Sequence, residues 1–308
     1  MKKAVIVQAY RTPIGKKGGI WKNDPPEFLA AEVMKKLVLD CHIDPEMIDD
    51  VILGNAAGPG GNLARLSSLK AGFPYRVPGV TIDRQCGSGL EAINLAARLI
   101  QSGAGEIYLA GGLESTSRAP LKMDYMGEDQ PPRIYSRAHF SPEEIGDPEM
   151  GEAAENVAER YGISREEQDQ YALLSYQKAL QAEKNGNFDR EMVPIREIRD
   201  DECPRPSMNY GKLLPRMKPV FREHGTVTAG NSCLLNDGAA VALIMSEEMA
   251  QKLGLPPMLT FIDAVAEGVD PHYLGMGPVP AVRRLLARNE LTIEEIDRIE
   301  FNEAFASQ

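Results

Sequence analysis

The sequence predicts an α/β protein, and three observations carry that prediction. Continuous apolar runs, typical of strands buried on both faces, alternate with segments of helical periodicity. A stretch near the start of the chain recurs near its end, which indicates an internal duplication. The 308 residues are 43% hydrophobic, an ordinary share for a globular protein, and their number suggests about two domains.

Strands and helices alternate over the first 115 residues. Strands are expected at 4–9, 51–54, 80–82 and 107–110, with helices at 27–39, 63–70 and 90–100. Such alternation is typical of a parallel sheet covered by helices on both faces. A further buried strand at 238–245 is expected to return to this sheet.

Residues 116–234 interrupt this rhythm. Proline, methionine and charged residues are scattered there, and strand patterns are scarce. A helix pair is expected at 151–161 and 165–185, because Ser164 can cap the second helix and acidic residues fill its first turn. The region is therefore interpreted as a long insertion with helices of its own.

The internal repeat links residues 43–56 with residues 291–304. Asp49 matches Asp297, and the apolar pair Val51 and Leu53 matches Ile299 and Phe301. A strand pattern at 261 and a helix pattern at 279–287 precede the second copy, as equivalents precede the first. Three parts are expected: 1–115 with 235–255, the insertion 116–234, and 256–308. The last is an incomplete second copy, so we expect a chain truncated relative to the fold it encodes, because half a sheet exposes an unpaired edge.

Charge and cysteine content exclude several functions. A net charge of -11 argues against nucleic acid as a partner. The four cysteines form no CxxC pair, so neither a metal site nor a disulfide framework is expected, and a reducing, cytoplasmic compartment fits. No run approaches the roughly 20 apolar residues needed to span a bilayer, and a strand pattern at residue 4 leaves no room for a signal peptide. No membrane partner is therefore expected.

Cys86 is the candidate nucleophile. It stands between the strand at 80–82 and the helix that follows. A thiol there faces the positive end of a helix dipole and backbone N–H groups without helical partners, and both favour the thiolate. Gly87 and Gly89 would let a ligand come close. The alternative is a small buried hydrophobic residue, as most free cysteines are.

The sequence resembles the thiolase family (acetyl-CoA acetyltransferases and 3-ketoacyl-CoA thiolases) over its whole length. Seven stretches match in family order, and those around Cys86 and Asn302 are the most specific. They are 11–15, 83–90, 111–115, 225–231, 236–240, 275–278 and 302–306. The resemblance implies two βαβαβαββ halves, a long helical loop insertion in the first and an incomplete second half. It also implies a homodimer or homotetramer paired through the first sheet.

The resemblance implies an acyl transfer in two steps. Cys86 would take the acyl group from an acyl-CoA, and either the enolate of acetyl-CoA or free CoA would then attack the acylated Cys86. The backbone N–H of Cys86 would face the thioester oxygen as an oxyanion hole. Asn302 would hold a water in a second oxyanion hole. Considered without the resemblance, Asn302 could equally be a residue at the end of a strand whose side chain is hydrogen-bonded to its own backbone.

Coenzyme A would enter as the substrate thioester, and no separate cofactor is expected. Arg205 would meet the CoA phosphates or adenine, because a guanidinium suits both, although a solvated loop arginine is the alternative. The residues expected along the pantetheine arm, any of which could equally be core, are Ala229, Ser232, Cys233, Met150, Phe221, Ala304 and Phe305.

Three departures from the family pattern bear on activity. Glu149 stands where the family has a histidine, and Cys233 stands where it has a serine, so weaker CoA binding is expected. The family's Gly-His-Pro and Cys-x-Gly-Gly-Gly motifs, which supply the activating histidine and the acid–base cysteine, do not occur in the 308 residues. A nucleophile without its base loses most of its rate, so this chain is expected to be inactive or nearly so.

A second function from another class stays open. The chain could be a non-catalytic, truncated thiolase homologue that acts as an acyl-CoA-binding or interaction protein. A ketoacyl synthase is a third interpretation, but that class has a histidine where residues 302–305 stand here.

Overall fold

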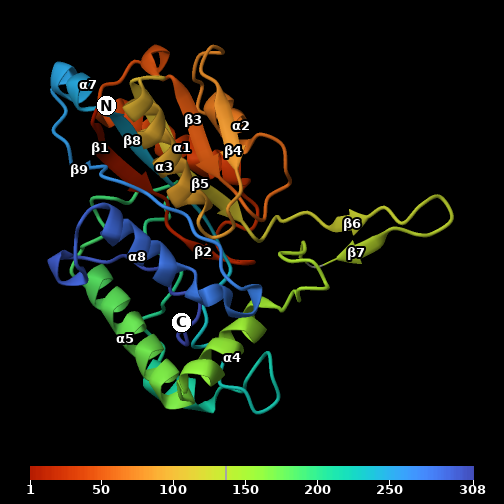
Figure 1. The fold of residues 1–308 in the computed structure, drawn as a ribbon. Helices are drawn as coiled ribbons and strands as arrows, with labels where there is room; N and C mark the ends of the chain where they lie inside the picture. Colours follow the sequence, from red (N-terminus) through yellow and green to blue (C-terminus); the bar gives the residue numbers. More distant parts are fainter. Residues whose placement is uncertain (136) are drawn as a thin grey trace. The chain divides into compact units, whose positions relative to one another are not determined.

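The computed structural model describes residues 1–135 and 137–308, and its backbone contacts group them into two compact units. Unit 1 holds a large sheet, and unit 2 holds a helix-rich region with a short hairpin (Figure 1). Unit 1 consists of Met1–Pro120, Gly186–Cys203 and Leu235–Ile262. Unit 2 consists of Leu121–Asn185, Pro204–Leu234 and Asp263–Gln308.

Unit 1 is built on a 7-stranded sheet with the order β4-β3-β5-β8-β1-β9, in which β2 also pairs with β8. The strands are β1 Ala4–Arg11, β2 Gly15–Lys16, β3 Asp50–Gly54, β4 Gly79–Ile82, β5 Ile107–Ser115, β8 Asn236–Ser246 and β9 Leu259–Thr260. The helices are α1 Pro26–Asp40, η1 Pro45–Met47, α2 Leu63–Lys70, α3 Ser88–Ser102 and α7 Glu247–Leu253. The succession β1-α1-β3-α2-β4-α3-β5-β8 confirms the expected βαβαβαββ half.

The sheet is mixed, not parallel throughout as the alternation predicted. β4, β3 and β5 run parallel, whereas β8 returns antiparallel between β5 and β1. Ser115 at the end of β5 pairs with Asp237 at the start of β8. The insertion therefore begins at the end of β5 and returns beside that same end, so β8 must run antiparallel to β5.

Helices cover both faces of the sheet, as expected. α1 packs Leu29 and Met34, and α2 packs Leu63, against the face that carries Leu53. On the other face, α3 packs Ala96 and Ile100 against strand residues. The small inward residues let α3 lie close to the sheet. Its other side leaves Leu90 and Leu95, 65% and 37% exposed, open to solvent.

Unit 2 contains the predicted helix pair as α4 Met150–Tyr161 and α5 Arg165–Lys184. Ser164 caps α5 in a full capping box with Glu167, which confirms the predicted start of that helix. The remaining elements of this unit are β6 Lys122–Asp124, β7 Arg133–Tyr135, α6 Tyr210–Leu213, η2 Leu214–Arg216, η3 Pro271–Met276, α8 Pro278–Arg288 and η4 Ile293–Glu295.

The second copy of the repeat is only partly regular. Its helix is present as α8, and the strand expected near residue 261 is the short β9, which pairs with β1. Ile299 and Phe301, which match Val51 and Leu53 of β3 in the repeat, do not form a strand: both side chains are exposed, at 61% and 42%, in backbone without regular structure. A strand persists only beside a pairing neighbour, and this stretch has none among the described residues.

No helix within residues 1–135 and 137–308 is long and apolar enough to cross a bilayer.

The contact between β3 and α3 predicts that Gly54→Ala destabilises unit 1. A Cβ on Gly54 would lie 2.6 Å from the backbone nitrogen of Gly89 and 2.6 Å from the Cβ of Ser88, so α3 must move. We expect a loss of about 1–3 kcal/mol in the free energy of unfolding, measured by urea denaturation. Gly268→Ala is the control, because a Cβ there meets nothing within 4 Å. Equal stability of the two variants would contradict the close contact.

Candidate functional site

Cys86 lies in a tight turn between β4 and α3. Hydrogen bonds from the Gly87 N–H to the Arg84 carbonyl (3.1 Å) and from the Ser88 N–H to the Gln85 carbonyl (3.0 Å) close the turn. Cys86 is exposed and directly precedes Gly87, the N-cap residue of α3. Its thiol therefore lies outside the apolar core, beside the helix end whose N–H groups lack helical partners.

Glycines seat this turn on the ends of the parallel strands. A Cβ on Gly112, near the end of β5, would lie 3.4 Å from the Gly54 carbonyl oxygen and 3.4 Å from the Cα of Gly89. Gly54 is closer still to the first residues of α3, because a Cβ there would lie 2.6 Å from the Gly89 nitrogen. The side-chain-free contact allows the N-terminal turn of α3 to lie directly against β3 and β5. Cys86 is thereby placed at the carboxyl ends of parallel strands, where α/β sheets commonly bind ligands.

A cavity of about 610 Å³ opens beside Cys86 within unit 1. Its lining combines the Cys86 turn with the ends of β3 and β5 and the start of β8, and includes Asn55, Gln85, Glu114 and Asp237. The volume and the mixture of small apolar residues with a few polar side chains are typical of small-molecule sites.

Two carboxylates fix the walls of this cavity. Glu114 accepts hydrogen bonds from the Ala56 N–H (2.9 Å) and from the side-chain amide of Asn55 (2.9 Å). Asp237, which is buried, accepts from the N–H (2.9 Å) and the hydroxyl of Ser117. Because neutral donors of the walls engage both groups, the carboxylates hold the loops in place. The sequence interpretation had assigned neither carboxylate a role of its own.

Aromatic residues expected along the pantetheine arm meet in unit 2. The rings of Phe221 and Phe305 lie edge to face with centroids 6.1 Å apart. Phe221 also packs so tightly on Gly151 that a Cβ there would collide with its ring. Met150, the first residue of α4, precedes that glycine in the chain. Met150 and Phe221 are each 37% exposed, so this cluster is not sealed core.

A backbone pairing joins two other parts of the expected set. The Cys233 N–H donates to the Ala304 carbonyl at 2.9 Å, beside a bridge between Ser232 and Phe305. The Ser232 hydroxyl donates to the Thr228 carbonyl at 2.7 Å. Residues that lie far apart in the sequence are thus neighbours in unit 2.

Three of the residues expected to act at the site, Arg205, Ala229 and Asn302, take no part in the aromatic cluster or the backbone pairing within the described part of the chain. Arg205 is exposed in the loop before α6, and its backbone N–H donates to the Tyr210 hydroxyl at 2.8 Å. Ala229 and Asn302 are exposed as well, the latter in backbone without regular structure. Cys86 belongs to unit 1 and Asn302 to unit 2, so a shared role for them stays a prediction.

A buried carboxylate in α4 was missed from the sequence. Glu155 is 3% exposed and accepts hydrogen bonds from the N–H groups of Thr226 (2.9 Å) and Val227 (2.8 Å) and from the Thr226 hydroxyl (3.0 Å). It thereby anchors the start of the 225–231 stretch to the helix. A possible signal was its place beside Ala154 and near Val157, small apolar residues that mark the inward face of α4.

Glu303 was also missed as a contact of α5. Its carboxylate accepts hydrogen bonds from the hydroxyls of Tyr171 (3.0 Å) and Ser175, which lie one helical turn apart. Burial and the neighbouring Glu303 raise the pKa of Tyr171. Glu303, the residue after Asn302, is thereby anchored to α5.

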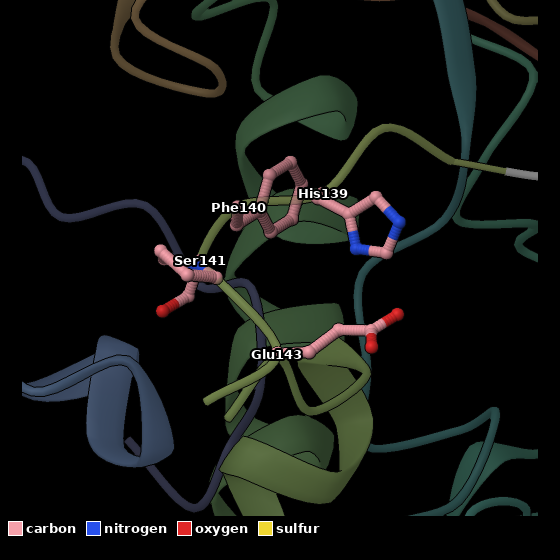
Figure 2. Close-up of a pocket in the computed structure, with 5 residues that line it drawn as sticks. His139, Phe140, Ser141 and Glu143 are labelled. Atoms are coloured by element: carbon pink, nitrogen blue, oxygen red, sulfur yellow. The ribbon is translucent and has the colours of Figure 1, made fainter. Parts of the chain in front are cut away.

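A second cavity, of about 420 Å³, lies in unit 2 and is lined by His139, Phe140, Ser141, Pro142 and Glu143 (Figure 2). The His139 ring lies 2.9 Å from Asp147, which also receives hydrogen bonds from Arg137 at 3.0 Å. The Arg137 guanidinium lowers the pKa of Asp147. These charges satisfy one another, so the arrangement is typical of a structural ion-pair cluster. Among residues 1–135 and 137–308, no His, Cys, Asp and Glu group could hold a metal ion.

Comparison with known proteins gives one consistent result. Residues 4–248 match the family model of the thiolase N-terminal domain, and residues 255–308 match that of the thiolase C-terminal domain. A Staphylococcus epidermidis protein named as a candidate acetyl-CoA C-acetyltransferase, VraB, is 48% identical over 100% of this chain and 82% of its own length. The Staphylococcus aureus relative of the same name is 49% identical with the same coverage. The crystal structure of a Bacillus anthracis acetyl-CoA acetyltransferase superposes with a TM-score of 0.92 and 41% identity, covering 100% of this chain and 81% of that one.

The position of Cys86 predicts selective alkylation. Cys86 and Cys233 are both exposed, so exposure alone predicts similar rates with iodoacetamide. The helix N-terminus beside Cys86 should make it react about tenfold faster at neutral pH, because the thiolate is the reactive form. Burial raises the pKa of the Cys41 thiol, so Cys41 should be slowest and should respond only at higher pH. Peptide mapping measures all three rates, and equal rates for Cys86 and Cys233 would remove the proposed activation.

Glu155 and Glu159, two of the three glutamates of α4, provide a matched stability test. Glu155→Ala leaves buried N–H groups of the 225–231 stretch without acceptors, so we expect a loss of about 2 kcal/mol or more. Glu159→Ala removes only an exposed ion pair with Arg222 and should change stability little. Urea unfolding followed by circular dichroism compares them. A small effect at Glu155 would show that the stretch has another anchor.

Proposed function

Because the chain belongs to the thiolase family, we propose that it acts on acyl-CoA as an acyltransferase of thiolase type, with Cys86 as the acyl carrier. The observation that carries this proposal is the exposed Cys86 thiol at the N-terminus of α3, beside a cavity of about 610 Å³. The acetyl-CoA acetyltransferase names of the relatives and of the superposed structure support the choice of acetyl-CoA as the substrate.

The first proposed step forms an acyl-enzyme. The Cys86 thiolate attacks the carbonyl carbon of the acyl-CoA thioester, the bond from that carbon to the CoA sulfur breaks, and CoA leaves with its electron pair and takes up a proton. The Cys86 N–H is the proposed donor to the developing oxyanion.

The second proposed step releases the acyl group. The enolate carbon of acetyl-CoA attacks the acyl-Cys86 carbonyl carbon, which forms a carbon–carbon bond and breaks the bond to the Cys86 sulfur, so that the cysteine leaves as thiolate. In the degradative direction, the CoA thiolate attacks the same carbon and breaks the same bond, which releases acyl-CoA as the last step of thiolysis. Asn302 is the proposed holder of a water that donates to the second oxyanion.

The proposed CoA contacts lie in unit 2. The half-exposed aromatic pair of Phe221 and Phe305, with Met150 nearby, supports an apolar contact for the pantetheine arm. The paired stretch with Ser232, Cys233 and Ala304 offers polar backbone beside it, and Ala229 lies in the turn just before Ser232. Arg205, exposed and cationic, is the proposed contact for phosphate or adenine.

The 308 residues contain neither a Gly-His-Pro nor a Cys-x-Gly-Gly-Gly sequence, to which the resemblance assigns the base and the acid. The acyl-enzyme on Cys86 is therefore a more direct readout of the proposed chemistry in these 308 residues than turnover is. Acyl-CoA binding without chemistry is the second candidate function.

Acylation of Cys86 by acetyl-CoA tests the proposal. After incubation with acetyl-CoA, intact and peptide mass spectrometry should find one acetyl group on Cys86 of the wild-type chain and of Cys233→Ala. Cys86→Ala should carry none, because the accepting sulfur is gone. An unmodified wild-type Cys86 together with saturable CoA binding, measured by calorimetry, would favour the binding function. Acetyl groups spread over lysines and Cys233 would overturn the assignment of Cys86.

A further inference from the structure

The residue before Cys86 has an unusual backbone. Gln85 lies in the left-handed region with a φ of 49°. Residues with a Cβ rarely adopt this conformation, and it persists only where surrounding interactions hold it. Such residues concentrate at functional sites. Neighbouring groups must therefore hold Gln85 in place.

Both peptide groups of Gln85 are held by side chains. The Asp83 carboxylate accepts a hydrogen bond from the Gln85 N–H at 2.7 Å. On the other side, the Ser88 hydroxyl donates to the Gln85 carbonyl at 2.6 Å and accepts from the Arg84 N–H at 2.7 Å. A hydroxyl has a single hydrogen to donate, and Ser88 donates it to the Gln85 carbonyl within this turn.

Ser88 is itself fixed by its surroundings. It is only 3% exposed and is the first residue of α3. The missing side chain of Gly54 lets Ser88 lie against the end of β3, where a Cβ on the glycine would come within 2.6 Å of the Ser88 Cβ. A chain of contacts thus runs from the sheet through Ser88 to Gln85, whose next residue is Cys86.

We propose that Ser88 is a positioning residue for Cys86, acting by clamping Gln85 in its left-handed conformation. The inference rests on the proposed role of Cys86 as the acyl carrier. Without the hydroxyl, Gln85 relaxes toward negative φ, which rotates the following peptide and turns the Cys86 thiol away from the helix end. The serine does not touch substrate in this role.

Alkylation of Cys86 over a range of pH tests the clamp without requiring turnover. The variants are Ser88→Ala, the double variant Gln85→Gly with Ser88→Ala, and the control Ser67→Ala. Ser67 is also fully buried and also loses a hydrogen bond to a carbonyl (Leu63, 2.7 Å), but it lies in α2. In each protein, iodoacetamide rates at Cys86 are compared with those at Cys233 by peptide mapping.

We expect Ser88→Ala to slow alkylation of Cys86 by about tenfold and to move its pH profile toward that of Cys233. Glycine adopts positive φ without a steric cost, so the double variant should recover most of the wild-type rate. Ser67→Ala should leave Cys86 unchanged. A Ser88→Ala protein with the wild-type rate, or a loss that Gln85→Gly fails to restore, would overturn the clamp. If the variants show these differences in alkylation but acetyl-CoA does not acetylate Cys86, the clamp stands and only the proposed acyl transfer is refuted.

Discussion

The contact between the first turn of α3 and the ends of β3 and β5 is the constraint on which the rest of unit 1 depends. At Gly54 the backbone of β3 lies so close to the first turn of α3 that a Cβ would come within 2.6 Å of the Gly89 nitrogen and would separate helix from sheet. Gly89 and Gly112 lie at the same contact, where a Cβ would meet its nearest neighbours at ordinary distances of 3.7 Å and 3.4 Å. This close contact also determines how far the N-terminus of α3 extends over the ends of the strands. It therefore sets both the surroundings of the Cys86 thiol and the floor of the cavity beside it.

The two units hold their candidate residues by different means. In unit 1, the turn at Cys86 is defined by backbone geometry and by short hydrogen bonds within a few residues. In unit 2, stretches far apart in sequence are held by a buried carboxylate, an aromatic pair and a backbone bridge.

Local signals in the sequence predicted most of the fold. α2 was placed at its observed bounds, and the capping residue Ser164 marked the start of α5, because periodicity and caps depend on neighbours a few residues away. The direction of β8 was not predicted, since it depends on where the insertion re-enters the sheet. Phe301 matches Leu53 of β3 in the repeat but lies in no strand, because a strand needs a pairing partner that the sequence pattern does not reveal. Glu155 was missed for a similar reason: its role is set by N–H groups about seventy residues away.

The position of β8 in the sheet has a consequence for synthesis of the chain. β1 leaves the ribosome long before β8 and β9, which are its neighbours in the sheet. Residues 12–235 must therefore be translated before the N-terminal strand can find its long partner. An apolar segment such as Val5–Val7 then waits for seconds without a pairing neighbour, at ordinary translation rates of about 5–20 residues per second. Nascent unit 1 is accordingly expected to depend on chaperone protection during this interval.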